Sequence, residues 1–282
     1  KFRDAALANA RAGRYNKPYR AINRYEGRAA QMDQKTLAYV NLYAVLGALP
    51  RLTELDPAAR QLATVKKPFR LAFRVKNGPA ATLVFGDGPC RMEEGADICD
   101  MRLHFSSPEK FNGMIAGTVT PFPLKGLHHV FFLLRRFTKL TDILTKYLKA
   151  APEALADEGF FNISTELMFR VIVQAVAQIG NHDKIGSFSA SNIVDGDVQF
   201  SIEDGPAATI RVRDHALTAI FEMPENPRAV MHFTSLKLAR ALFDGKVNAV
   251  ACIGRGEIEM RGMISMIDNI NRILDRVSVY LS

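Results

Sequence analysis

The sequence predicts a mixed α/β (α+β) fold in two related domains, each combining antiparallel strands with helices. Three observations support this prediction. The phrase Asn-Gly-Pro-Ala-Ala-Thr at residues 77–82 returns as Asp-Gly-Pro-Ala-Ala-Thr at residues 204–209, an offset of 127. Apolar and polar residues alternate around both copies, which is the period of a β-strand. Apolar stripes at spacings of three and four residues, typical of helices, occur in both halves.

The similarity between the two halves extends beyond this phrase. Two more blocks recur in the same order at an offset of 128: residues 104–107 (HFSS) as 232–235 (HFTS), and 117–119 (GTV) as 245–247 (GKV). Three blocks with a one-residue drift indicate a duplicated domain. Gly126 comes 9 positions after Gly117, whereas Gly262 comes 17 positions after Gly245. We therefore expect the first copy to lack part of a strand or loop there.

Composition indicates a soluble, globular chain. The 282 residues are 48% hydrophobic and 23% charged, which is enough for two domains with their own cores. The three cysteines are too few for a disulfide framework, so a reducing compartment and a cytoplasmic location are expected. We expect no apolar run to reach the roughly 18–20 residues of a membrane span.

The formal net charge of +8 is concentrated at the start of the chain. Residues 1–28 hold eight basic and two acidic side chains. Such a basic arm can contact an anionic membrane surface transiently through nonspecific attraction. The alternative is an arm that is simply solvated. Specific nucleic-acid binding is not expected.

The first half begins with helices and changes to strands at Phe69. Pro50 is expected to stop a helix that carries Leu37, Val40 and Tyr43 on one face. Asp56 and Pro57 start the next helix as cap and first-turn residue. The further expected elements are strands over 69–75, near 83–85 and over 98–105, a helix from 108, a short strand near 122–125 and a long helix over 126–148.

The second half repeats this pattern after a linker near residues 150–159. Ser164 is expected to cap a helix that runs to about Ile179, with Gly180 at its end. The expected elements after it are strands near 196–202, 207–213, 216–222 and 229–234, a helix near 235–243, a strand near 255–260 and a final helix from about 263.

The second half then shows a resemblance to a known family. Residues 242–247 (LFDGKV) and 258–262 (IEMRG), followed by a closing amphipathic helix, resemble the end of the SCP2 (sterol carrier protein 2) domain. The resemblance implies five-stranded, mainly antiparallel sheets covered by helices on one face, with an apolar tunnel for a lipid between the layers. The expected boundaries are 1–56 for a helical extension, 57–150 for a divergent first domain, 151–184 for a linker and connecting helix, and 185–282 for the second domain.

The function expected from this resemblance is non-catalytic binding, and transfer or presentation, of a fatty acyl chain or a sterol-like or quinone-like lipid. Two alternatives stay open: a protein–protein scaffold without a ligand, and an accessory factor in lipid or quinone biosynthesis at the membrane surface. The large apolar side chains expected to face the interlayer space, which otherwise simply fill the core, are Phe221, Phe233, Leu238, Leu242, Ile264, Ile267 and Ile270, together with Phe131 and Leu134.

Reactive groups give no pattern typical of an enzyme. Adjacent histidines His128 and His129 would point apart on a helix, without a carboxylate one turn away for a metal. His104 and His232 occupy matching places and are expected to be ordinary strand histidines. The sequence holds no Walker lysine motif or Gly-x-Ser-x-Gly elbow. We therefore expect no catalysis, no metal and no cofactor.

Overall fold

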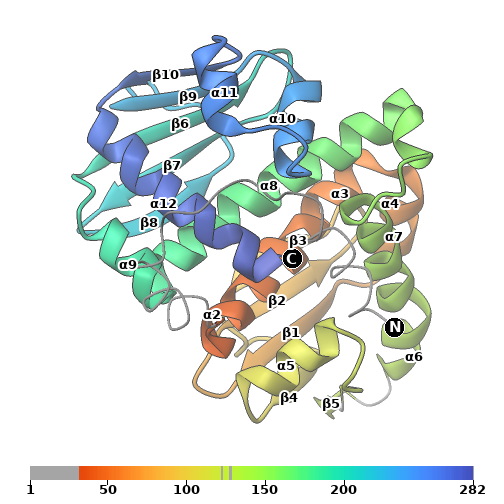
Figure 1. The fold of residues 1–282 in the computed structure, drawn as a ribbon. Coiled ribbons are helices and arrows are strands. Elements are labelled where there is room, and N and C mark those ends of the chain that lie inside the picture. Colours follow the sequence, from red (N-terminus) through yellow and green to blue (C-terminus); the bar gives the residue numbers. More distant parts are fainter. Residues whose placement is uncertain (1–31, 122, 127–128, 282) are drawn as a thin grey trace, which may run out of the picture. The chain divides into compact units, whose positions relative to one another are not determined.

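The computed structural model describes residues 32–281 apart from 122, 127 and 128. The basic arm, and the membrane contact expected for it, lie outside the described residues. Within the described range, helices and two five-stranded sheets alternate along the chain. The mixed α/β class with helix-covered sheets is confirmed (Figure 1).

The segment before the first sheet is helical almost without a break. It consists of α2 (Gln34–Tyr39), η2 (Val40–Val45), η3 (Leu46–Ala48), α3 (Leu49–Leu55) and α4 (Pro57–Ala63). The expectation that Pro50 stops a helix was wrong. Pro50 lies in the first turn of α3, where a missing N–H group is tolerated. Asp56 caps α4 as expected, because its carboxylate accepts a 2.7 Å hydrogen bond from the Ala59 amide.

The first sheet contains β1 (Phe69–Val75), β2 (Ala80–Phe85), β3 (Arg91–Glu94), β4 (Met101–Phe105) and β5 (Pro123–Lys125), in the order β3-β2-β1-β4-β5. Only β1 and β4 pair in parallel, and the other three pairs are antiparallel. Between β4 and β5 lies α5 (Pro108–Ile115). Strand β3 was not predicted, because this short edge strand is charged and only partly buried.

The second sheet repeats the first in its strand order. It contains β6 (Gly196–Ile202), β7 (Ala207–Arg213), β8 (Ala216–Ile220), β9 (Ala229–Phe233) and β10 (Ile258–Gly262), in the order β10-β9-β6-β7-β8. Again the central pair, β6 with β9, is the parallel one. Ile202 faces Phe233 across it, as Val75 faces Phe105 in the first sheet. These strand pairs match the repeated sequence blocks.

The repeated phrase forms the same tight turn in both sheets. Asn77 and Asp204 have positive φ angles of 57° and 51°. Asn and Asp tolerate this left-handed conformation better than other side chains, and the following glycine completes the turn. The phrase therefore recurs because it joins β1 to β2 and β6 to β7 with one register.

Between the fourth and fifth strands of its sheet, the second half has one more helix than the first. After the first sheet come α6 (Val130–Phe132), η5 (Leu133–Phe137) and α7 (Thr138–Leu148). After β9 come α10 (Leu236–Phe243), α11 (Ala249–Gly254), β10 and α12 (Ile264–Leu281). The first half has no helix between residues 117 and 121, where α11 lies in the second. The expected loss in the first copy is thus an α11 equivalent and part of β5.

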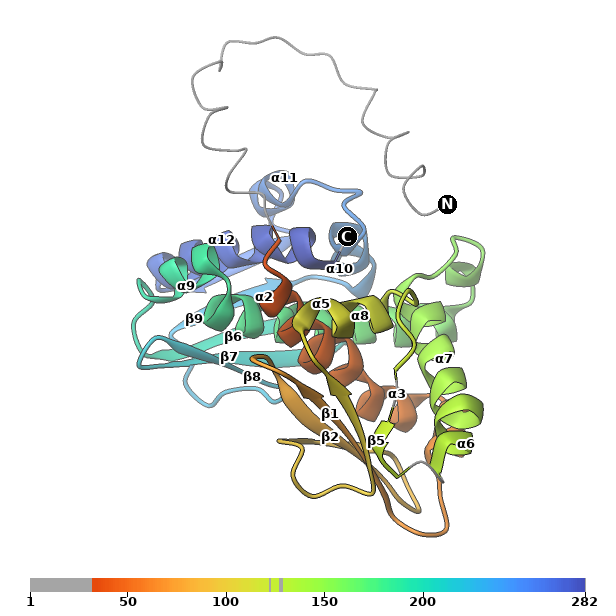
Figure 2. The ribbon, with the colours of Figure 1, turned by 90° about the horizontal axis from the view of Figure 1, so that it is seen from below.

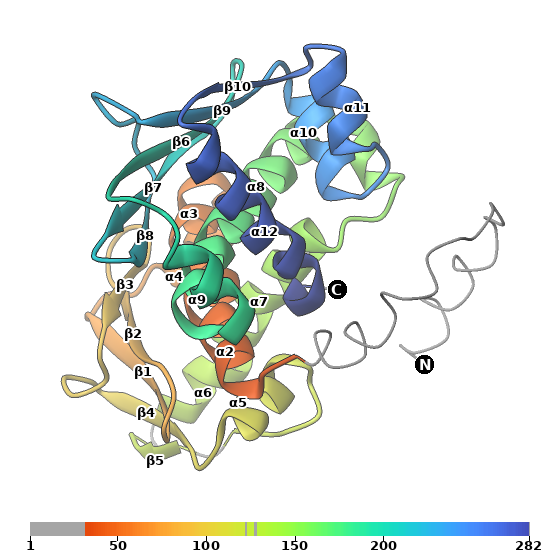
Figure 3. The same cartoon turned by 60° about the vertical axis from the view of Figure 1, so that its left-hand side comes forward.

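Helices gather on one side of both sheets, a layering that Figures 2 and 3 show from two directions. The long helix α8 (Glu158–His182) belongs to this layer, and α9 (Lys184–Ala190) follows it. Asp157 caps α8 through a 2.7 Å hydrogen bond from the Phe160 amide, so Ser164 is not the cap as expected. Ser164 is instead buried about two turns further on, and its hydroxyl donates to the Tyr147 carbonyl.

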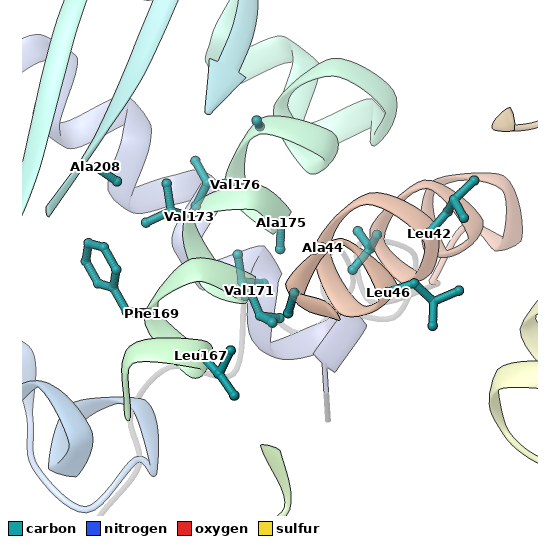
Figure 4. Packing of buried hydrophobic residues seen from close by; sticks show 14 of the residues in the cluster. Leu42, Ala44, Leu46, Leu167, Phe169, Val171, Val173, Ala175, Val176 and Ala208 are labelled. Carbon is teal, nitrogen blue, oxygen red and sulfur yellow. The ribbon is translucent and has the colours of Figure 1, made fainter. Parts of the chain in front are cut away.

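The core is centred on α8, which contacts η2 on one side and the second sheet on the other. Figure 4 shows Val173 directed towards Ala208 of β7 and Ala175 towards Ala44 of η2. Among the described residues, α8 is long and apolar enough to span a membrane by length and composition alone, with a mean hydropathy of 1.3. No apolar run of this length was expected from the sequence. Half of the most apolar 18-residue stretch of α8 is buried inside the protein, as in the core helix of a globular protein.

Candidate functional site

Three of the predicted site residues in the second half lie in a packed core. Phe233, Ile267 and Ile270 are 4%, 2% and 0% exposed. The Phe233 ring meets the Phe243 ring edge-on, with centroids 6.3 Å apart. In this structure their side chains fill the space between sheet and helices, which is the alternative weighed from the sequence. Their expected role as a lipid site stays a prediction.

The other predicted residues of the second half are divided between the core margin and the surface. Phe221, Leu238 and Leu242 are half-buried and pack against the core. The guanidinium carbon of Arg170 lies 4.3 Å from the centre of the Phe221 ring. Ile264, in the first turn of α12, is 64% exposed. The expected role of these four residues in lipid binding also stays a prediction.

Phe131 and Leu134 lie on the surface at the start of the closing helix of the first half. They are 72% and 62% exposed. Phe131 forms one wall of a groove of about 650 Å³ between the end of α4 and the α6–η5 segment. The residues that line this groove are Gln61, Thr64, Val65, Lys66, Phe131, Phe132, Arg135 and Arg136. We call it the α4–η5 groove.

The apolar floor of the α4–η5 groove is anchored in the core. The Phe132 ring lies 4.6 Å from the Phe69 ring of β1 and 4.9 Å from the Phe85 ring of β2. Leu133 and Phe137, which follow Phe132 in the chain, are also buried. The groove therefore has a fixed wall that does not depend on the exposed side chains.

A hydrogen bond joins the two walls of the groove. The guanidinium of Arg136 donates to the carbonyl oxygen of Thr64 at 2.6 Å, which satisfies an acceptor at the end of α4. The Val65 amide in turn donates to the Gly86 carbonyl at 2.6 Å. These contacts hold α4, η5 and the end of β2 at one spacing.

The α6–η5 wall includes a π-helical turn, Leu133–Phe137. Such turns are rare and occur often at functional sites, because the wider turn redirects side chains. Arg135 lies on this turn with its guanidinium carbon 5.8 Å from the centre of the Phe131 ring, in cation–π range. An exposed aromatic ring and a cation thus stand side by side at the mouth of the groove.

The chemistry of the α4–η5 groove suits an amphiphile. Phe131, Phe132 and Val65 offer apolar surface, while Lys66 and Arg135 are exposed cations at its edge. An apolar tail gains from leaving water in such a groove, and an acidic head group gains from the neighbouring cations. The volume lies within the range of about 300–1,000 Å³ typical of small-molecule sites.

A smaller pocket of about 200 Å³ lies where the edge strands of the two sheets approach α8 and η2. It is lined by Tyr43, Ala44, Gly47, Ala48, Met92, Glu93, Glu94, Arg170, Gln174 and Phe221. Burial and the nearby charge of Arg51 lower the pKa of Arg170. Burial, with the charge of Glu94, raises the pKa of Tyr43 to about 12. The phenol stays neutral and donates to the Ala80 carbonyl.

One row of polar groups in the second sheet has the composition of a catalytic triad. The Ser201 hydroxyl lies 3.0 Å from Nδ1 of His232, whose Nε2 lies 3.0 Å from the Glu203 carboxylate. The neighbouring backbone amides of residues 202, 203, 205 and 234 all donate to carbonyl groups, so the described backbone leaves no pair of donors for an oxyanion here. His232 lies on β9, as the strand histidine that the sequence predicted.

The described residues hold no group of three His, Cys, Asp or Glu side chains that could bind a metal ion. All three cysteines are free and buried, and burial raises the pKa of the Cys90 thiol to about 11. A buried neutral thiol is a poor nucleophile.

Sequence reasoning missed most of the α4–η5 groove. Phe131 and Leu134 were predicted to line the space between sheet and helices, and of these two only Phe131 lines the groove. Val65, Lys66 and Arg135 were not predicted as site residues. The available signal was the Arg135–Arg136 pair, which interrupts an otherwise apolar stretch of helix. The opposite wall comes from a distant part of the sequence, and no local pattern marks it.

Comparison with known proteins gives similarity in fold only. No family model matches the chain, and no curated protein matches it. Among solved structures, a "UbiJ-SCP2 Ubiquinone synthesis protein" is 12% identical over 37% of this chain and 94% of its own, with a TM-score of 0.30. The sterol carrier protein domain 2 of Helicoverpa armigera is 14% identical over 39% of this chain and 88% of its own, with a TM-score of 0.33.

A third similar structure is the palmitated SCP2L2 of Aedes aegypti, 14% identical over 38% of this chain and 90% of its own, with a TM-score of 0.28. Each of these proteins matches about two fifths of the chain, which is less than half of its length. At identities and TM-scores this low, the matches carry no argument about what the chain binds. These SCP2 structures are what the chain is similar to, each over about two fifths of its length.

Proposed function

We propose that this protein binds an amphiphile with an apolar tail and an acidic head group in the α4–η5 groove, and presents or transfers it without catalysis. The observation that carries the proposal is the joining of aromatic surface, from Phe131 and Phe132, to the cations Lys66 and Arg135 in one groove of about 650 Å³. Burial of apolar surface yields roughly 25 cal/mol per Å², so an acyl tail alone gives useful affinity.

We further propose that the chain is a tandem of two SCP2-like copies, each beginning with its own long helix. The two identical strand orders support this division. So does the matching of Asp56 with Asp183: each caps the short helix before its sheet, and each accepts a hydrogen bond from a tyrosine of the closing helix. On this division α8 opens the second copy and is not a connecting helix.

The ligand proposal is tested with a fluorescent fatty acid titrated into wild-type protein and two variants. Phe131→Ala and Arg135→Gln should each raise the Kd about tenfold, which corresponds to ~1.4 kcal/mol of lost binding free energy. Both side chains are exposed, so the fold should be unaffected. Matched controls are Phe188→Ala on α9, where the phenylalanine is 68% exposed, and Arg272→Gln on α12. Equal affinity in all five proteins would contradict the proposal.

A second candidate function, a protein–protein scaffold, is favoured by one observation. Exposed apolar side chains also occur away from the groove, with Phe188 at 68%, Met223 at 62% and Val250 at 76%. Such residues are common in docking surfaces when they are contiguous. If Phe188→Ala and Val250→Ser abolish association with a copurifying protein while fatty acid binding is absent in the wild type, the scaffold function is the better account.

A further inference from the structure

We propose that the start of the closing helix of the first half docks on an anionic membrane surface. The docking face consists of Phe131, Leu134, Arg135, Lys139 and, from the end of α4, Lys66. This inference goes beyond the proposed ligand binding and does not depend on it. It also differs from the membrane contact expected of the N-terminal arm, because it uses described residues on a folded helix.

The apolar part of the docking face is unusually exposed. Phe131 and Leu134, three residues apart, expose 72% and 62% of their surface. Isolated exposed apolar residues need no explanation. Here, however, Phe131 lines the apolar α4–η5 groove, and Leu134 lies about one helical turn after it. An amphipathic helix with Phe and Leu on one face is the usual element for shallow insertion into a membrane interface.

The charges around these apolar residues are complementary to an anionic surface. Arg135 and Lys139 are exposed on the same helix, and Lys66 and Lys67 are exposed opposite them. Asp87 and Asp142 are the acidic side chains exposed in the adjoining turn and further along the helix. The balance is positive, and basic residues near a membrane surface attract anionic lipids. This complementarity selects an anionic lipid surface over an apolar protein partner.

The helix can present this face without losing its fold. Its opposite side is held by buried Leu133 and Phe137 and by Phe132 against the two strand ends. Arg136, which points to the Thr64 carbonyl, fixes the position of the helix beside α4. Phe131 and Leu134 contribute little to the core, so their contact with lipid costs no internal packing.

Membrane anchoring by two weak signals is stronger than by either alone. In the full chain, the basic arm of residues 1–28 supplies nonspecific attraction. The docking face adds apolar contact, which salt does not screen. The structure therefore predicts binding to anionic vesicles that is weakened but not abolished by salt.

The test is cosedimentation of the full chain with phosphatidylcholine vesicles, with and without phosphatidylglycerol. Wild-type protein should bind the vesicles that contain phosphatidylglycerol. Leu134→Ser and Arg135→Glu should each weaken this binding about tenfold. The control Phe188→Ser removes an equally exposed phenylalanine from α9 and should bind like the wild type. Vesicle binding that is unchanged in Leu134→Ser and Arg135→Glu would assign the contact to the arm and overturn the inference.

Leu134 separates this inference from the proposed ligand binding, because it does not line the α4–η5 groove. Leu134→Ser should keep wild-type affinity for a soluble fatty acid while losing vesicle binding. A site-specific readout is available because all three native cysteines are buried. A polarity-sensitive dye on Phe131→Cys should shift to the blue with anionic vesicles, whereas the same dye on Phe188→Cys should not. A shift at both positions, or at neither, would contradict docking through this face.

Discussion

Asp183→Ala is expected to lower the free energy of unfolding by about 3–5 kcal/mol, the cost of breaking a buried ion pair by removing one partner. Asp183 is 3% exposed. Its carboxylate accepts hydrogen bonds from the Arg276 guanidinium at 2.9 Å and from the Tyr280 hydroxyl at 2.5 Å. The same carboxylate accepts from the Gly186 amide at 2.8 Å and so caps α9. Alanine removes the acceptor of all these hydrogen bonds and the carboxylate that pairs with the Arg276 guanidinium.

The measurement is urea unfolding followed by circular dichroism at neutral pH. The matched control is Asp157→Ala, which removes the cap of α8 and with it a single 2.7 Å hydrogen bond from the Phe160 amide. This variant should lower the free energy of unfolding by about 1 kcal/mol. Asp183→Asn keeps a capping oxygen but loses the charge, and it should fall between the two. A loss in Asp183→Ala no larger than in Asp157→Ala would show that the contact with Arg276 and Tyr280 contributes nothing to stability.

The same carboxylate makes stability depend on pH in a defined direction. Burial raises the pKa of Asp183, but the hydrogen bonds from Arg276 and Tyr280 outweigh burial and hold the pKa below its ordinary value of 3.8. A group with a lowered folded-state pKa stabilises the fold above its unfolded pKa, and this contribution is lost as the pH falls through the folded pKa. Asp183→Asn should therefore differ most from the wild type at neutral pH, and the difference should shrink below pH 3.8.

Gly262→Ala is expected to cost about 3–4 kcal/mol, through a left-handed backbone and a collision with the neighbouring strand. Gly262 has a φ angle of 89°. A Cβ atom there would lie 2.2 Å from the carbonyl oxygen of Arg228, and main-chain atoms of β9 cannot move aside without disrupting the sheet. Gly126 has the same environment in the first half, with a φ of 80° and the carbonyl oxygen of Asp100 at 2.3 Å.

Gly245→Ala is the matched control for this prediction. Gly245 has a similar φ of 67°, but the space where a Cβ atom would go is open. Gly245→Ala should lower the free energy of unfolding only by the cost of a left-handed backbone at alanine, about 1–2 kcal/mol. Thermal unfolding of the three proteins separates the two terms. Equal midpoints for Gly262→Ala and Gly245→Ala would mean that the close approach to Arg228 does not constrain the start of α12.

Much of the fold was predictable where residues alternate cleanly. The strands over 196–202 and 207–213 match β6 and β7, because their alternating apolar residues are all buried: Val198, Phe200 and Ile202 in β6, and Ala208, Ile210 and Val212 in β7. The helix expected near 235–243 matches α10, which Ser235 caps by accepting a hydrogen bond from the Leu238 amide. Strand β3 was missed because an edge strand of Arg, Met, Glu and Glu carries no alternation to detect.

Long-range packing decided the points where the sequence misled. A proline usually ends a helix, but Pro50 lies in the first turn of α3, where its missing N–H group is tolerated. Ser164 has the composition of a cap, yet it lies inside α8 and donates to the Tyr147 carbonyl. This contact joins two helices that no local pattern relates. Likewise Phe131 was selected as an interlayer residue, whereas packing of the adjacent Phe132 turns it to the surface.

The candidate site was predictable only in its chemistry. Large apolar residues of the two closing helices were selected from the sequence, and their role stays a prediction. Their arrangement depends on the π-helical turn at Leu133–Phe137 and on the approach of α4, which brings Lys66 opposite Arg135. Neither feature has a sequence period.

The most direct test of the ligand proposal is photo-crosslinking with a fatty acid that carries a diazirine near the end of its tail, followed by peptide mapping. The proposed site predicts labelling of peptides that contain Val65 or Phe131, and competition by unlabelled fatty acid. Labelling confined to peptides with Ile267 and Ile270 would contradict it and return the site to the interlayer space of the second half. No labelling at all would contradict ligand binding by this protein.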